Sequence, residues 1–92
     1  MIRVIIERNI AESLESHYEK IAKNNLEKAC KAPGFISGES MRGVNNINHR
    51  VVLCSWKSAS DWQNWHQSPV RKGLMATLRP LLEGEEVITV VE

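Results

Sequence analysis

The sequence predicts an α+β fold of the ferredoxin-like kind, β-α-β-β-α-β, with a four-stranded antiparallel sheet. Three observations predict it. Four short segments have strand-like patterns, two longer segments carry apolar residues at helical spacing, and they alternate as strand, helix, strand, strand, helix, strand. Right-handed crossover connections then place both helices on one face of the sheet.

The first strand is predicted at Ile2–Glu7, "IRVIIE", because β-branched residues dominate it. Asn9 and Glu12 have the spacing of a capping box, so we expect the first helix to begin just after Asn9. Pro33-Gly34 ends this helix. Apolar residues recur every three to four positions along it and are expected to face the sheet: Leu14, Tyr18, Ile21, Ala22, Leu26 and Ala29.

The second and third strands follow the first helix. "FISGESMRG", beginning at Phe35, alternates along its length, and its glycines predict a bent or irregular strand. The turn cluster "GVNNIN" separates it from His49–Lys57, "HRVVLCSWK". This third strand has a continuous apolar core, which is typical of a strand that is covered on both faces.

The second helix is predicted in two pieces. Ser58 and Asp61 form another capping-box spacing and begin a short helix that carries two tryptophans and a histidine. Ser68-Pro69 begins the helix again, with serine as the N-cap and proline at the first helical position. Gly84 ends this segment. Its apolar stripe is expected to be buried: Val70, Leu74, Leu78 and Leu81.

The last strand is predicted at Glu86–Val91, and it is apolar on both faces, like the third strand. Both helices lie on one face of the predicted sheet, so the other face needs a cover. A second copy of the same sheet, related by a two-fold axis, covers it most simply. The sequence therefore predicts a homodimer.

The length and composition of the chain limit the kinds of protein it can be. A chain of 92 residues predicts one domain, 1–92, and 42% hydrophobic with 25% charged residues is ordinary for a globular protein. The net charge is +1 and the basic residues are scattered. Nucleic-acid binding needs a concentrated positive surface, so no nucleic-acid partner is expected.

No membrane association is expected either. Charges at Arg3 and Glu7 interrupt the apolar start of the chain, and no apolar run approaches the ~20 residues of a membrane helix. The two cysteines, Cys30 and Cys54, fit no metal or redox spacing and lie in apolar patterns, so we expect reduced, buried thiols. These features favour a cytoplasmic protein.

The chain resembles a known family over essentially its whole length. "PGF" opens the second strand at Pro33, and the block "W-K-S-x-S-D-W-x-x-W-x-x-S-P" runs from Trp56 to Pro69. Both are similar to the antibiotic biosynthesis monooxygenase (ABM) domains of the dimeric α/β barrel group. The resemblance implies two sheets that face each other across a dimer, with one pocket per subunit between sheet and helices. It implies several chemistries: oxygenation of phenols, anthrones or quinols with O₂ and no metal or flavin, haem degradation, isomerisation, or binding alone.

All three tryptophans lie within ten residues, and they are either core residues or the walls of a pocket for a flat ligand. By the resemblance, Trp65 holds the place of a pocket-lining residue, and its indole could stack on an aromatic substrate. Trp62 lies one helical turn earlier. It either packs in the core or at a dimer contact, or it lines the same site as Trp65. Trp56 ends a strand and is expected in the core.

Three polar residues are further candidates. Haem-degrading relatives carry an asparagine near the end of the first strand, which points to Asn9 as a catalytic residue, although helix capping explains it equally. Tyr18 and Arg79 could hold a substrate oxygen or stabilise an oxyanion. Otherwise Tyr18 packs on the sheet and Arg79 is solvated.

No metal site is predicted, because His17, His49 and His66 have no ligands at suitable spacing. By the resemblance His66 is one residue past the usual histidine position, so it is expected to be exposed and uninvolved. The position of the axial histidine in haem-degrading relatives is Met75 here. Met75 is therefore expected to line the pocket or the core, and a haem-degrading site is disfavoured.

The leading prediction is a cofactor-independent monooxygenase that acts with O₂ on a small aromatic or quinol-like substrate. The substrate itself would supply the electrons, and the protein would position it and exclude water. Trp65 would stack on the substrate, with Asn9 or Arg79 at its oxygen. Two alternatives stay open: a dimer that binds a small hydrophobic ligand without catalysis, and a haem-binding or haem-degrading protein.

Overall fold

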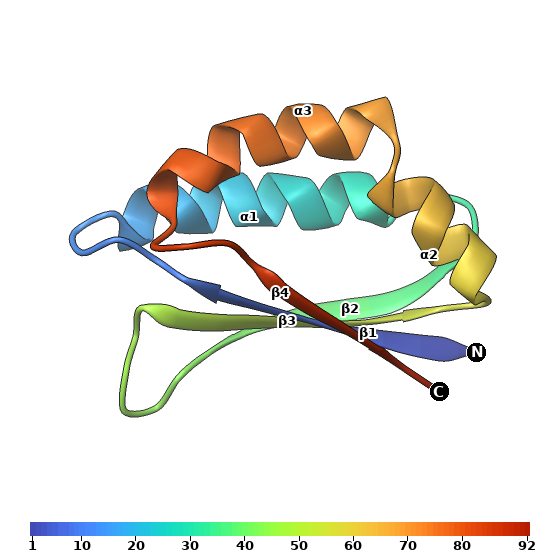
Figure 1. Ribbon diagram of the computed structural model, residues 1–92, viewed down its shortest axis with the longest axis horizontal. Helices are drawn as coiled ribbons and strands as arrows, with labels where there is room; N and C mark the ends of the chain where they lie inside the picture. Colours follow the sequence, from blue (N-terminus) through green and yellow to red (C-terminus); the bar gives the residue numbers. More distant parts are fainter.

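A computed structural model describes residues 1–92 and confirms the ferredoxin-like fold (Figure 1). The sheet has the strand order β2-β3-β1-β4, and all its pairs are antiparallel. No helix is both long enough and apolar enough to cross a membrane. The elements are β1 (Ile2–Asn9), α1 (Glu15–Ala29), β2 (Phe35–Arg42), β3 (His49–Trp56), α2 (Ala59–His66), α3 (Pro69–Leu78), the 3-10 helix η1 (Arg79–Leu81) and β4 (Val87–Val91).

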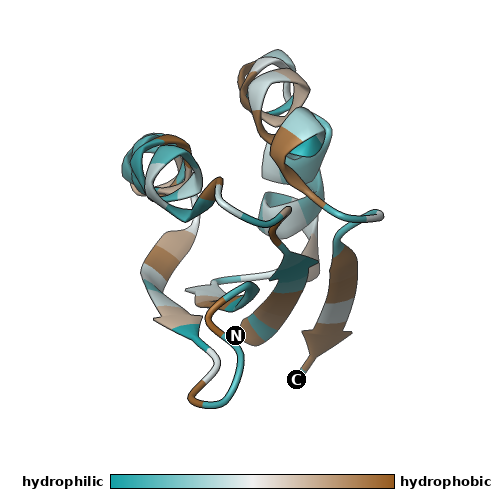
Figure 2. Cartoon of the chain, turned by 90° about the vertical axis from the view of Figure 1, so that its left-hand side faces the viewer, coloured by the Kyte–Doolittle hydropathy of each residue, from teal (hydrophilic) through white to brown (hydrophobic).

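The helices cover one face of the sheet, here called the inner face, and leave the outer face uncovered (Figures 1 and 2). Burial alternates along β1 and β3, as strand geometry requires. The core divides into two clusters. One joins β1 and β3 to Trp62 of α2, and the other joins α1 to α3 and η1 through Tyr18, Met75 and Leu78.

The outer face combines apolar and charged residues. Its apolar members come from all four strands, and β4 is hydrophobic over most of its length (Figure 2). Ile5 and Leu53 are cross-strand partners at its centre, and both are only partly covered. The other apolar residues on this face are Met41, Val51, Val87 and Val91.

The expected start of the first helix was wrong. α1 begins at Glu15 after Leu14, which makes no side-chain cap, and Asn9 is the last residue of β1, opposite His49. The reason lies in the backbone. The carbonyl of Asn9 accepts a hydrogen bond from the amide of Glu83, and the next amides donate to carbonyls of distant segments. These long-range bonds extend the strand beyond the predicted Glu7, so Asn9 and Glu12 form no capping box.

The second helical segment forms in two pieces, as predicted. The Ser58 hydroxyl accepts from the amide of Asp61, and the Ser68 hydroxyl accepts from the amide of Arg71. The predicted burial of Val70 was wrong, because this side chain is 53% exposed. Leu78 and Leu81 are buried as predicted, but in the first two turns of α3 the buried positions are Arg71 and Met75 rather than Val70 and Leu74. The helix also ends earlier than expected, in η1 rather than at Gly84.

Two further local features concern the end of α1. Cys30 was expected to be buried, but it is exposed, because the buried position of the last turn is Ala29 and Cys30 is the C-cap after it. Gly34 has φ +85°, and a Cβ there would lie 2.3 Å from the carboxylate of Asp61. A glycine is needed at this point, where the chain turns beneath the first turn of α2.

Candidate active site

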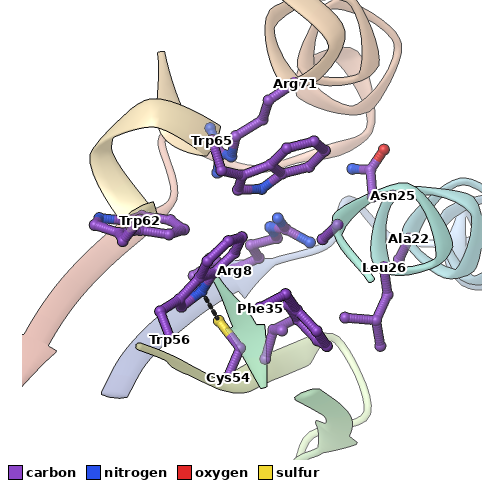
Figure 3. A pocket seen from close by; sticks show the side chains of 13 residues that line it. Arg8, Ala22, Asn25, Leu26, Phe35, Cys54, Trp56, Trp62, Trp65 and Arg71 are labelled. Atoms are coloured by element: carbon purple, nitrogen blue, oxygen red, sulfur yellow. Dashed lines mark hydrogen bonds between the residues drawn. The ribbon is translucent and has the colours of Figure 1, made fainter. Parts of the chain in front are cut away.

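A pocket lies between the inner face of the sheet and the helices (Figure 3). We call it the tryptophan pocket, and it holds about 450 Å³ of atom-free space including its open mouth, of which the cavity proper is about 40 Å³. β1 and β3 form its floor, α1 forms one wall, and α2 with the start of α3 forms the other. It is lined by Ile6, Arg8, Ala22, Asn25, Leu26, Ala29, Phe35, Val52, Cys54, Trp56, Trp62, Trp65 and Arg71.

The aromatic side chains form one packed group. The Trp56 indole is stacked with that of Trp65, with ring centroids 6.5 Å apart and an angle of 24° between the planes. Trp62 and Phe35 meet Trp56 edge-on at 5.9 and 5.3 Å. Trp56 and Trp62 are fully buried, whereas Trp65 is only partly buried. Trp65 is therefore the one indole of the three with surface left for a ligand, and the other two support it.

Two buried arginines share one carboxylate behind the aromatic walls. Arg8 Nε donates to one oxygen of Glu86 at 2.9 Å, and Arg71 Nη2 donates to the other at 2.6 Å. Both arginine side chains are less than a tenth exposed. Burial raises the pKa of Glu86, but the hydrogen bond and charge of Arg71, together with Arg8, lower it further, so the net shift is downward. The pair of guanidinium groups with one carboxylate leaves one positive charge uncompensated at the pocket.

Asn25 and Cys54 are the other polar groups on the pocket wall. Asn25 Oδ1 is buried and has no hydrogen-bond partner, so a ligand donor could reach an otherwise unsatisfied acceptor there. Cys54 Sγ accepts from Trp56 Nε1 at 3.4 Å. Burial raises the pKa of the Cys54 thiol, which therefore stays protonated and is a poor nucleophile.

His66 differs from its expected position. It is half-buried rather than exposed, and its ring stacks on Trp62 one helical turn earlier, with centroids 5.1 Å apart. Burial, together with the charge of Arg71, lowers the pKa of His66. The imidazole is therefore neutral near pH 7, and it does not line the tryptophan pocket.

A model of the antibiotic biosynthesis monooxygenase family matches residues 1–77. The chain belongs to this family. Solved structures share its fold: a conserved protein from Methanosarcina mazei Go1 superposes with a TM-score of 0.92 at 20% identity, over 99% of this chain and 90% of that one. SnoaB, a cofactor-independent oxygenase from Streptomyces nogalater, superposes with a TM-score of 0.82 at 16% identity, over 96% and 90%. Rv0793 from Mycobacterium tuberculosis superposes with a TM-score of 0.88 at 15% identity, over 99% of this chain and 92% of that one.

A longer protein contains a similar segment. The myocardial zonula adherens protein of Xenopus tropicalis is 28% identical over 82 residues, which is 89% of this chain. The chain spans only 17% of that protein's length. The likeness therefore concerns one segment of that protein.

The structure brings together only part of the residues predicted for the site. Trp62 and Trp65 both line the tryptophan pocket. Tyr18 is buried behind it, where its hydroxyl accepts from Arg8 Nη1 at 3.2 Å. Asn9 is exposed at the far end of β1 and lines a separate hollow with Glu12.

Met75 and Arg79 lie together away from the pocket. Met75 is 1% exposed in the core cluster between α1 and α3, and Arg79 is exposed. Both line another hollow, beside Glu86. Neither residue is therefore placed to contact a ligand that stacks on Trp65.

The polar part of the site was missed by the sequence analysis. Arg8, Arg71, Glu86 and Asn25 were not among the predicted residues. Arg8 continues the alternation of Ile2, Val4 and Ile6 and so occupies an inward position of β1, a signal that was available in the sequence.

Proposed function

We propose that this member of the family is a cofactor-independent monooxygenase that acts with O₂ on a small, electron-rich aromatic substrate. One observation carries the proposal: an aromatic pocket lined by a partly exposed indole, Trp65, lies against two buried arginines that share one carboxylate. Family membership and the fold shared with a cofactor-independent oxygenase support it.

The pocket is suited to a flat ligand, but it is narrow. Offset stacking on Trp65 would add ~0.5–1.5 kcal/mol beyond the burial of apolar area. A cavity of about 40 Å³ holds a few water molecules, whereas ligand pockets are typically ~300 Å³ or more. Binding therefore needs lining side chains that are only partly buried, such as Trp65 and Leu26, to move apart.

The chemistry needs the substrate as an anion, because an ionised phenol or anthrone gives electrons to O₂ far more readily than the neutral form. The uncompensated charge of the Arg8–Glu86–Arg71 group favours that anion, since opposite charges interact strongly where water is excluded. When a ring CH₂ group is oxygenated, one atom of O₂ becomes the oxygen of the new carbonyl group and the other leaves as water. The substrate supplies all four electrons, so no co-reductant is required.

The proposed assembly is a homodimer that buries the outer face. Ile5 and Leu53 lie at the centre of that face, with Met41 and Val91 around them. Met41 and Val91 are 41% and 39% exposed, which is unfavourable for apolar side chains left in water. A two-fold interface between two such sheets would cover them.

Oxygen uptake by the metal-stripped protein tests the proposal. We expect saturable uptake with members of a panel of hydroquinones and anthrones, and a large loss in Trp65→Ala. Gln63→Ala, an exposed change on the same helix, should behave like wild type. Binding without uptake would instead favour a ligand-binding protein, and a strong visible absorption band on adding haemin would favour a haem protein.

A further inference from the structure

Three arginines lie side by side across the inner face. Arg8 of β1 is the cross-strand partner of Arg50 of β3, and Arg50 is the partner of Arg42 of β2. Cross-strand partners point to the same face, so these residues form one row beneath α1, which we call the arginine row. Like charges at directly opposite positions destabilise a sheet.

The number of hydrogen-bonding and ion-pair partners decreases along the arginine row, from Arg8 to Arg42. Arg8 is paired with Glu86. Arg50 donates from Nε to the carbonyl of Ile47 at 2.6 Å and from Nη1 to Glu19 at 3.0 Å. Arg42 is exposed and makes no side-chain hydrogen bond or ion pair. Positive charge is therefore least compensated at the Arg42 end.

A groove of about 350 Å³ lies at this end of the row, between α1 and strands β2 and β3. Three cations line it, Lys23, Arg42 and Arg50, against the single carboxylate of Glu19, so its walls carry two excess positive charges. We call it the basic groove. Glu19 is 54% exposed and can turn away into water, which would free Arg50 for another anion.

The basic groove adjoins the tryptophan pocket. Ala22, Leu26 and Val52 line both hollows, so a ligand could extend from one into the other along β3. Successive residues of a strand advance by ~3.3 Å, which puts Arg50 ~7 Å from Val52 and ~13 Å from Cys54. One end of this combined site is aromatic and the other is cationic.

We propose that the substrate is an acidic aromatic compound whose ring lies in the tryptophan pocket and whose carboxylate, ~7–13 Å away, binds Arg50 and Arg42 in the basic groove. This inference rests on the proposed function, since it extends the same site. Arginine suits the role because its planar guanidinium binds a carboxylate with two parallel hydrogen bonds.

Calorimetric titration with compounds that are not oxidised tests the inference without turnover. 4-(2-Naphthyl)butanoate and its primary amide differ in charge but hardly in size. We expect the acid to bind about tenfold more tightly than the amide, and the advantage to shrink in high salt. Arg42→Gln should remove most of the advantage, and Glu19→Gln should increase it, because that change removes the competing carboxylate. Lys72→Gln, an exposed change on α3 that lines neither hollow, should change neither affinity.

The outcomes separate this inference from the proposed function. If both compounds bind equally, Trp65→Ala weakens both, and Arg42→Gln changes neither, the acidic-substrate inference is wrong and the aromatic pocket stands. If neither compound binds, the aromatic pocket and the inference that rests on it both fail. A naphthyl phosphate of the same length that binds when the carboxylate does not would also overturn the carboxylate assignment.

Discussion

Glu86→Gln is expected to destabilise the protein strongly, because Glu86 is the one carboxylate between two buried arginines. The Glu86 side chain is 11% exposed, and those of Arg8 and Arg71 are 5% and 8% exposed. Glutamine keeps the shape but loses the charge, and its NH₂ group must face one of the guanidinium groups. Breaking a buried ion pair in this way costs ~3–5 kcal/mol, since the remaining charges are left uncompensated. For a chain of this size the Tm should fall by roughly 12–24 °C for ~3 kcal/mol.

The pH dependence gives this prediction a second readout. The pKa of Glu86 is lowered in the folded protein from an ordinary value of 4.5, so its stabilisation is present above that pH and is lost as the pH falls through the folded value. Urea unfolding at pH 7 should show the full difference between wild type and Glu86→Gln, and the difference should shrink below pH 4.5. Glu85→Gln, an exposed neighbour, is the control. A Glu86→Gln protein within ~0.5 kcal/mol of wild type at pH 7 would refute the reasoning.

Three other predictions follow from burial. Trp62→Ala should cost ~3–5 kcal/mol in urea unfolding and Trp65→Ala clearly less, because only Trp62 is fully buried; equal losses would show that Trp65 is a core residue too. A thiol reagent should modify Cys30 in the native protein, whereas Cys54 should react only after the protein unfolds. Reaction of both thiols under native conditions would contradict the burial of Cys54. Leu53→Lys at the centre of the outer face should yield folded monomers in sedimentation velocity, whereas dimers of the variant would argue against that interface.

Local patterns predicted the elements of the fold well. The β-branched residues of β1, the apolar run of β3 and the serine caps of α2 and α3 each depend on residues close together in the chain, so the sequence shows them directly. The order of elements then limits the topology to few arrangements. Trp65 could also be predicted at the site, because the family resemblance includes its place between Ser58 and Pro69.

Long-range contacts decided what could not be predicted. The backbone of Asn9 is bonded to a segment more than seventy positions later, and no local signal reveals that a good capping residue is used in this way. Arg71 rather than Val70 is buried at the start of α3, where it donates to Glu86, a residue that meets this helix only in the folded chain. The charged half of the site is thus a product of tertiary packing, although the inward position of Arg8 was readable in β1.

Incorporation of ¹⁸O from labelled O₂ tests the central claim most directly. The metal-stripped protein, incubated under ¹⁸O₂ with an anthrone that supports oxygen uptake, should give a product with one labelled oxygen atom, and the other atom should appear in water. The labelled product should be strongly reduced in Trp65→Ala. Product formation no faster than in the protein-free reaction, or a rate that depends on added metal or flavin, would contradict a cofactor-independent oxygenase.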